Sequence, residues 1–396
     1  MTAQLTVLGV DGSALTDPAR EALAAAEVVV GAPRHLAAVA LPPGAQRVEL
    51  GAVGPALDAL DDRRAVLLAS GDPGFFGIVR LLRERGHRPL VLPARSSVAL
   101  LLARLGRSWD DVAVVSAHGR SLQPAINVCR ARAAVAVLTA PGAGPAEIGE
   151  ALHGWPRTLV VAEDLGGPAE RVSTVPAAEA ASRQWDPLNV VLCLRDPDAV
   201  PDRGWLAGGE PVPPEGGWAL PDDAFTHRAG MITKAEVRAL ALARLGPRPG
   251  CLVWDVGAGS GSVAVESARL GAAALAVERR PDDADRIRSN AAAHGVDVRV
   301  VQGDAPAALA GLPCPDAVFV GGGGPDVVAA AAAAGPTRFA VALAALDRIA
   351  PTRSALLAAG FTVDGTQLAA SRLVPLPDGA VRLAAVNPIT LLWGNR

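Results

Sequence analysis

A glycine-rich turn directly after an apolar run is the strongest chemical signal in this chain. The run Leu252–Val256 leads into Gly257–Gly261, in which three glycines alternate with other residues, and Ser262 follows. Glycines let a ligand approach the main chain closely, and the N-terminus of a following helix favours a carboxylate. A dinucleotide fingerprint would place its third glycine at position 262, so Ser262 disfavours an NAD-dependent oxidoreductase.

Acidic residues and further glycines follow the next three strand candidates. Glu278 ends the second strand, where its carboxylate can accept hydrogen bonds from both ribose hydroxyls of a nucleoside. Asp304 follows the third strand, where it or its neighbours can meet an adenine. Gly321 and Gly322 follow the fourth strand, which opens toward the group that is transferred. The order of these four features favours S-adenosylmethionine (SAM) as the ligand of this half.

These segments resemble the class I methyltransferases, and within them the decarboxylating precorrin methyltransferases. The resemblance rests on five segments: Met231–Lys234, Asp255–Ser262, Phe319–Gly323, Ser371–Leu373 and Arg382–Pro388. It implies two groups of site residues. The expected SAM-binding residues are Thr233, Asp255, Gly257, Gly259, Gly261, Ser262, Glu278 and Asp304. The expected catalytic residues are Lys234, Gly321 and Gly322.

The first half of the chain carries a different set of loops. Gly9 follows the start of an apolar N-terminal strand, and the loop Gly71-Asp72-Pro73-Gly74-Phe75-Phe76 follows the apolar run Ala65–Ser70. Ligands of α/β proteins bind at such carboxyl ends of strands. Ser96 or Ser97 can cap the next helix. Arg120, in the loop after a later strand, can hold a carboxylate through its planar fork, and His118 lies beside it.

These loops resemble the tetrapyrrole methylase family (class III methyltransferases) over roughly Thr6 to Leu194. The resemblance implies that SAM lies folded in a cleft between two subdomains. The residues that it assigns to SAM are Gly9, Gly71, Asp72, Phe75, Phe76 and Ser97. Asp11 stands where a second glycine is common in that family, which leaves open a first half that binds without catalysing.

The fusion of the two families in this order implies an enzyme of cobalamin biosynthesis. Its substrate would be a precorrin, methylated at the bridging carbons 5 and 15 and decarboxylated at the ring C acetate, with precorrin-8X as product. Arg120, Arg338 and Arg372 are candidates to hold the peripheral carboxylates, and Arg120 is the candidate that we place in the catalytic set. Both families commonly form oligomers, so the resemblance also implies a homo-oligomer.

The elements that position these residues predict an α/β fold with two domains. We expect a two-subdomain tetrapyrrole methylase domain over residues 1–198, a Pro/Gly-rich linker over 199–221 and a Rossmann-like class I domain over 222–396. Short apolar strands alternate with Ala/Leu-rich helices in both halves, which indicates α/β layering. Near the C-terminus we expect a helix around Ala340–Ala350 and a strand over Ile389–Trp393.

Composition restricts the partners. The net charge is −3, aromatic residues make up 3%, and no Lys/Arg-rich run occurs. A surface that binds nucleic acid is therefore poorly supplied, and an RNA-modifying methyltransferase is the weaker alternative. No apolar stretch reaches the length of a membrane span, and no signal peptide is visible, so we expect a cytoplasmic protein. The four cysteines match no zinc spacing, and no metal is expected.

Overall fold

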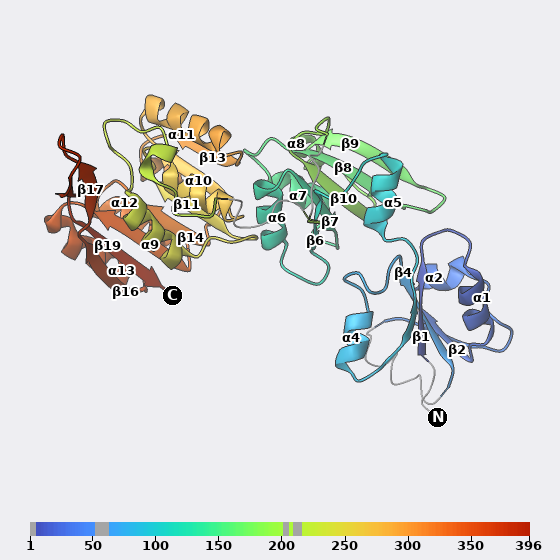
Figure 1. Cartoon of the computed structure of the whole chain (residues 1–396). Coiled ribbons are helices and arrows are strands. Elements are labelled where there is room, and N and C mark those ends of the chain that lie inside the picture. Colours follow the sequence, from blue (N-terminus) through green and yellow to red (C-terminus); the bar gives the residue numbers. More distant parts are fainter. Residues whose placement is uncertain (1–4, 52–62, 201–205, 209–215) are drawn as a thin grey trace.

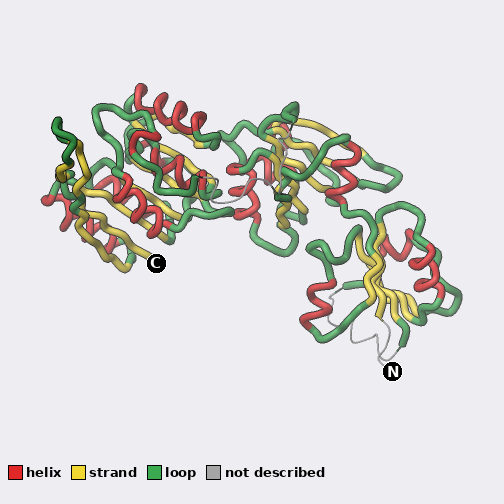
Figure 2. Tube along the Cα trace, viewed as in Figure 1, coloured by secondary structure: helices red, strands yellow, loops and turns green. Residues whose placement is uncertain are grey.

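Three sheets follow one another along the chain in a computed structural model. The structure describes residues 5–51, 63–200, 206–208 and 216–396. Figure 1 shows an N-terminal unit, a central unit and a C-terminal unit in an elongated row, and Figure 2 shows that each contains strands flanked by helices. The α/β class expected from the sequence is confirmed.

The first sheet is entirely parallel, with the strand order β3-β2-β4-β1-β5. All residues of β2 are buried, as a sheet covered on both faces requires. Its strands are β1 (Leu5–Val10), β2 (Val28–Gly31), β3 (Gln46–Glu49), β4 (Ala65–Ser70) and β5 (Leu90–Leu92). The described helices around it are α1 (Asp17–Ala24), α2 (Pro33–Ala38) and α4 (Val79–Glu84).

The second sheet is mixed, with the order β6-β7-β10-β8-β9, and only β6 and β7 in it are parallel. Helix α5 (Ser97–Arg104) leads into it, and Ser96 caps this helix by accepting a hydrogen bond from the Ala99 amide at 3.2 Å. The strands are β6 (Ala113–Ser116), β7 (Ala134–Leu138), β8 (Thr158–Glu163), β9 (Arg171–Pro176) and β10 (Asn189–Leu194). Its other helices are α6 (Leu122–Ala131), α7 (Pro145–Ala151) and α8 (Ala177–Ala180).

The third sheet has the doubly wound order expected for the second half, β13-β12-β11-β14-β15, extended by antiparallel β19 and β16. Its strands are β11 (Leu252–Val256), β12 (Ala273–Glu278), β13 (Val298–Gln302), β14 (Ala317–Val320), β15 (Arg338–Leu343), β16 (Thr362–Leu368) and β19 (Ile389–Asn395). A separate hairpin is formed by β17 (Ser371–Pro375) and β18 (Val381–Ala385). The helices are η1 (Asp222–Ala224), α9 (Ala235–Leu245), α10 (Ser262–Arg269), α11 (Pro281–Ala293), η2 (Ala307–Leu309), α12 (Pro325–Ala333), η3 (Leu346–Arg348) and α13 (Ile349–Ala358).

One expected element is wrong. The helix expected around Ala340–Ala350 starts in strand β15, which ends at Leu343, and the next α-helix, α13, begins only at Ile349 after the short η3. Alanine favours a helix in isolation, but Phe339–Val341 are fully buried between parallel β14 and antiparallel β19. Burial in the centre of a sheet overrides local propensity at such positions. Strands β3, β9 and β16 to β18 were not expected either, because their residues are largely exposed and carry no apolar run.

The central and C-terminal units share a built interface. Trp155 is 3% exposed and packs in the same apolar cluster as strand β11 of the C-terminal unit. The guanidinium of Arg157 is buried, donates to the main-chain oxygens of Cys129 and Arg130, and lies 2.7 Å from Asp297 of the C-terminal unit. The two units are thus joined by apolar packing and a buried cation as well as by the chain itself.

Candidate active sites

A cavity of about 1110 Å³ lies between the first and second sheets. Its walls come from the loop after β1, helices α1 and α2, the end of β4, the start of α5 and the loop after β8. Figure 1 shows that β1 and β4 run side by side in the first sheet, so that both loops open at the same edge. A cleft between two subdomains therefore exists where the resemblance places SAM.

Two of the residues expected to bind SAM line this cavity, Gly71 and Ser97. Gly9 lies beneath it, because a Cβ there would stand 2.1 Å from the Gly71 oxygen. Asp72 caps its own turn by accepting a hydrogen bond from the Gly74 amide at 2.8 Å. Gly9 and Asp72 thus shape the loops, and they do not reach the cavity wall.

The two phenylalanines and the arginine expected in the same site also lie outside the cavity lining. Phe75 packs against the core of the second sheet. Phe76 is 46% exposed, and the guanidinium of Arg120 lies 5.5 Å from the centre of its ring. Arg120 and Phe76 therefore form a cation–π pair with each other.

The loop after β1 is held by a carboxylate. Asp11 accepts hydrogen bonds from the Ser13 amide at 3.0 Å and from the Nε of Arg95 at 2.8 Å. Burial raises the pKa of Asp11, but these hydrogen bonds outweigh burial and lower the pKa to about 2. The next residue, Gly12, touches the loop after β8, because a Cβ there would stand 1.9 Å from the Gly166 oxygen. The residue that departs from the family pattern thus fixes one wall of the cavity.

A cluster that sequence reasoning missed lies on the opposite wall. The Nη2 of Arg34 donates to the Ser70 hydroxyl at 2.9 Å, and the Nε2 of His35 lies 2.8 Å from the same hydroxyl. All three residues line the cavity. Burial, followed by the charge of Arg34, lowers the pKa of His35 to about 4, so that its imidazole is neutral at neutral pH. Adjacent Arg34 and His35 follow β2 with no motif that marks them as functional.

The second cavity, of about 460 Å³, lies at the carboxyl ends of β11 to β14. Six of the expected residues line it: Gly257, Gly259, Glu278, Asp304, Gly321 and Gly322. Gly257 has a φ of 67°, and a Cβ there would stand 2.8 Å from the Gly322 oxygen. Any side chain at position 257 would therefore close the gap between the two glycine loops.

Two carboxyl groups shape the first glycine turn. Glu278 is 7% exposed and accepts hydrogen bonds from the Gly259 amide at 2.9 Å and the Arg280 amide at 3.0 Å. Asp255 is fully buried, and its Oδ2 accepts a hydrogen bond from the Ala264 amide at 3.0 Å. Burial raises the pKa of Asp255 to about 8 despite that hydrogen bond, so this carboxyl is mostly protonated at neutral pH. Its Oδ1 is buried without a partner.

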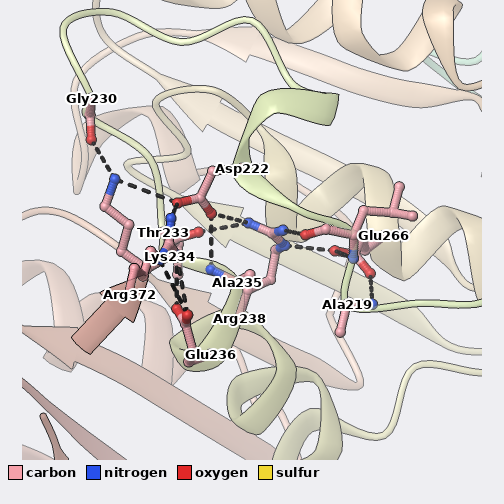
Figure 3. Close-up of polar contacts among 11 residues, drawn as sticks. Ala219, Asp222, Gly230, Thr233, Lys234, Ala235, Glu236, Arg238, Glu266 and Arg372 are labelled. Atoms are coloured by element: carbon pink, nitrogen blue, oxygen red, sulfur yellow. Dashed lines mark hydrogen bonds and ion pairs between the residues drawn. The ribbon is translucent and has the colours of Figure 1, made fainter. Parts of the chain in front are cut away.

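Thr233 and Lys234 lie in a polar network instead of the second cavity lining (Figure 3). The main-chain oxygen of Thr233 accepts a hydrogen bond from Arg238 at 2.6 Å, and the Nζ of Lys234 lies 3.5 Å from the Asp222 carboxylate. Arg372 also donates to Asp222, at 2.8 Å. The network thus ties the segment before α9 to the β17–β18 hairpin.

The centre of this network is a fully buried ion pair. The Nε of Arg238 donates to Glu266 at 2.6 Å, and both side chains are 0% exposed. The other Glu266 oxygen accepts a hydrogen bond from the Ala219 amide at 2.6 Å (Figure 3). Figure 3 shows Arg238 between the Asp222 side of the network and Glu266.

The remaining expected residues of the second half lie away from the cavity. Gly261 caps α10 with a φ of 72°, and Ser262 is the buried first residue of that helix. Arg338 begins β15, and its guanidinium lies against Gly246, at the amino ends of the parallel strands. The cavity lies at their carboxyl ends, so Arg338 cannot reach a ligand there.

The described residues contain no group of His, Cys, Asp and Glu side chains that could hold a metal ion. Among the helices that the structure describes, none has the length and apolar character needed to cross a membrane.

Comparisons with known proteins match each half of the chain to a methyltransferase family. The family model "Tetrapyrrole (Corrin/Porphyrin) Methylases" matches residues 8–181, and "Precorrin methyltransferase domain" matches residues 223–371. A Sinorhizobium protein named precorrin-6Y C(5,15)-methyltransferase [decarboxylating] is 42% identical over 339 residues, which cover 81% of this chain and 78% of that protein. The chain belongs to the precorrin-6Y C(5,15)-methyltransferase family.

Each half of this precorrin-6Y methyltransferase family member also resembles a shorter protein. A Salmonella typhimurium cobalt-precorrin-7 C(5)-methyltransferase is 33% identical over 204 residues, covering 48% of this chain and 98% of that protein. A probable cobalt-precorrin-6B C(15)-methyltransferase (decarboxylating) from Pyrobaculum calidifontis is 44% identical over 111 residues, covering 26% of this chain and 57% of that protein. The chain is therefore a methyltransferase, and the oxidoreductase alternative is excluded.

Proposed function

We propose that this enzyme methylates a precorrin at carbons 5 and 15 and decarboxylates its ring C acetate, giving precorrin-8X on the route to cobalamin. SAM is the proposed methyl donor at both sites. The carrying observation is the presence of two separate cavities, each at the carboxyl ends of parallel strands, in a chain whose relatives carry this activity. We assign carbon 5 to the first cavity and carbon 15 with decarboxylation to the second, following the names of the shorter relatives.

The proposed division of the chain follows the same logic. Residues 1–198 form the tetrapyrrole methylase domain, 199–221 the linker and 222–396 the class I domain. The two family matches fall inside the first and third of these ranges. We also propose a homo-oligomer in the cytoplasm, and size-exclusion chromatography with light scattering of the full chain tests the oligomer.

The second cavity has the groups that a nucleoside sulfonium needs. The Glu278 carboxylate stands at a strand end with its oxygens on two main-chain amides, and it has further lone pairs for ribose hydroxyls. The absence of a side chain at Gly257 leaves the main chain open to close approach. In this proposal Asp304 faces the adenine, and Gly321 and Gly322 border the methyl group.

The chemistry asks mainly for alignment. When bound, SAM would supply a sulfonium methyl group that an enamine-like bridging carbon can attack in line, with S-adenosylhomocysteine as the leaving group. The new bond is carbon to methyl, the sulfur–methyl bond breaks, and the macrocycle then loses a proton. In decarboxylation the bond to the carboxylate breaks, carbon dioxide leaves, and the electron pair enters the conjugated macrocycle, which takes up a proton. The protein contributes by holding the two reactants in register.

Two blocked variants test the division of labour. Gly257→Arg obstructs the second cavity, and Ser97→Trp places a bulky ring in the first. With a precorrin substrate and ¹³C-methyl SAM, Ser97→Trp should keep carbon dioxide release and the carbon 15 methyl group but lose the carbon 5 methyl group. Gly257→Arg should lose both carbon dioxide release and the carbon 15 methyl group.

Mixing the two folded variants is the control, because it should restore the doubly methylated product. Persistent carbon dioxide release in Gly257→Arg would contradict the assignment of decarboxylation to the second cavity. Loss of the carbon 15 methyl group in a folded Ser97→Trp variant would contradict the separation of the two sites.

A further inference from the structure

Three arginines line the first cavity, and their charges are balanced differently. Arg20 pairs with Asp17, and Arg95 lies 2.8 Å from Asp11. Arg34 lines the same cavity, but its partners in the described part of the chain are neutral: the Ser70 hydroxyl at 2.9 Å and the His35 ring at 3.3 Å. Arg34 is therefore the arginine of this cavity whose charge is not met by a carboxylate of the described residues.

The neighbours of Arg34 hold its guanidinium in a fixed direction. His35 is neutral, and the Nε of Arg34 donates to its Nε2 at 3.3 Å, while the Ser70 hydroxyl lies 2.8 Å from the same nitrogen, so the two groups share its single lone pair. Ser70 then accepts from Arg34 and donates to His35. Ser70 is the last residue of β4, so this chain of hydrogen bonds is anchored to the sheet.

Two N–H groups of Arg34 are used in these contacts, and a guanidinium has five. The remaining N–H groups can bind a carboxylate, for which the planar fork is well suited. Arg34 is exposed, and a cation at a cavity wall that no described carboxylate neutralises can pair with an anionic ligand that enters the cavity. The chemistry of the cavity therefore fits a ligand that carries a carboxylate on the side of α2.

We propose that Arg34 binds a carboxylate of the methyl acceptor in the first cavity, and that Ser70 and His35 are positioning residues for its guanidinium. This inference rests on the proposed function and makes it more specific. Arg34 replaces the three arginines that the sequence suggested as carboxylate anchors. Arg120 packs over the Phe76 ring, and Arg372 donates to Asp222. Arg338 lies against Gly246, at the amino ends of the parallel strands. SAM also carries a carboxylate, so the test must separate the two sources.

The test compares Arg34→Gln with Arg20→Gln in the full chain. Arg20 is the matched control, since it lines the same cavity but is already paired with Asp17. Loss of a charge-assisted hydrogen bond should raise KM for the precorrin in carbon 5 methylation by about 10- to 100-fold in Arg34→Gln. The Arg20→Gln variant should stay within about twofold of the parent. The Kd of SAM, measured by calorimetry, should not change in either variant.

The positioning role has its own readout. His35→Gln keeps an acceptor for the Ser70 hydroxyl, and its KM should stay close to that of the parent. His35→Leu and Ser70→Ala should raise KM with little change in kcat. Equal KM values for His35→Gln and His35→Leu would overturn the positioning role.

Direct binding keeps the anchor testable without turnover. Uroporphyrin, a stable tetrapyrrole with several carboxylates, serves as the probe in a fluorescence titration. Weaker uroporphyrin binding by Arg34→Gln than by Arg20→Gln supports the proposal, and equal binding overturns it. A higher Kd for SAM in Arg34→Gln would also overturn the proposal, because the carboxylate that Arg34 binds would then belong to SAM. Failure of the parent to bind SAM in this cavity would count instead against the proposed function.

Discussion

The two cavities are built in different ways. The first, of about 1110 Å³, lies between two sheets, and its wall residues range from Val10 to Val190. The second, of about 460 Å³, lies mainly at the carboxyl ends of four parallel strands of one sheet. Arginines line both cavities, but the second is also lined by glycines from three loops and by the Glu278 carboxylate. The first cavity thus has room for a large ligand, and the second suits a close fit around a nucleoside.

The largest expected effect is a loss of stability in the C-terminal domain, where the buried Arg238–Glu266 ion pair supports the second site. Arg238→Met leaves Glu266 buried without its cation, which should cost about 3–5 kcal/mol of unfolding free energy in the C-terminal domain. We expect the midpoint temperature of the C-terminal unfolding transition to fall, while the midpoint temperature of the first domain does not change. Arg80→Met removes an exposed ion pair on α4 and is the control, with little change expected. Equal shifts in the two variants would show that the buried pair does not support the second site.

The next effect is a pH dependence confined to the C-terminal domain. Because the pKa of Asp255 is about 8 in the folded chain and near 3.8 when unfolded, the folded state binds the extra proton between these values. The stability of this domain should therefore fall as pH rises from about 4 to about 8. Asp255→Asn removes this contribution, so its stability relative to the parent should rise over that window by the order of a few kcal/mol.

Thermal melts of the two proteins at pH 5 and pH 8 measure that difference. Asp285→Asn, which changes an exposed carboxyl of α11, is the matched control and should follow the parent at both pH values. A constant difference between Asp255→Asn and the parent would refute a protonated Asp255.

A smaller effect concerns ligand affinity at the second cavity alone. Glu278→Gln keeps the shape of the side chain but removes the charge that strengthens hydrogen bonds to ribose hydroxyls. We expect SAM affinity at the second site to fall by about 10- to 100-fold, since hydrogen bonds to charged groups contribute about 1.5–3 kcal/mol. Calorimetry should show an unchanged first site in the same titration. Weakening of both sites would mean that the cavities are coupled.

The contrast between the cavities also explains what the sequence could predict. Gly257, Glu278 and Asp304 follow successive strands of one parallel sheet, so their order along the chain already places them at one edge. The structure brings the three residues to the lining of one cavity. Arg34 and His35 enter the first cavity through α2, and only the packing of two subdomains brings them opposite the loop after β8.

The predicted site residues that lie away from the cavities are those whose side-chain direction cannot be read from the local sequence pattern. Arg338 was selected as a cation in the right domain, but the amino end of a strand lies on the side of the sheet away from the ligand. Lys234 is the last residue of a segment that carries the family resemblance, yet its side chain turns toward Asp222 in a network that the sequence does not indicate. Side-chain direction at such positions depends on partners that are distant in the chain.

Calorimetric titration of SAM into the parent, Gly257→Arg and Ser97→Trp tests the central claim, two independent methylation centres, most directly. The account predicts two sites in the parent and one in each variant. A single site in the parent that is lost in Gly257→Arg and kept in Ser97→Trp would contradict it, because the first cavity would then bind no SAM of its own.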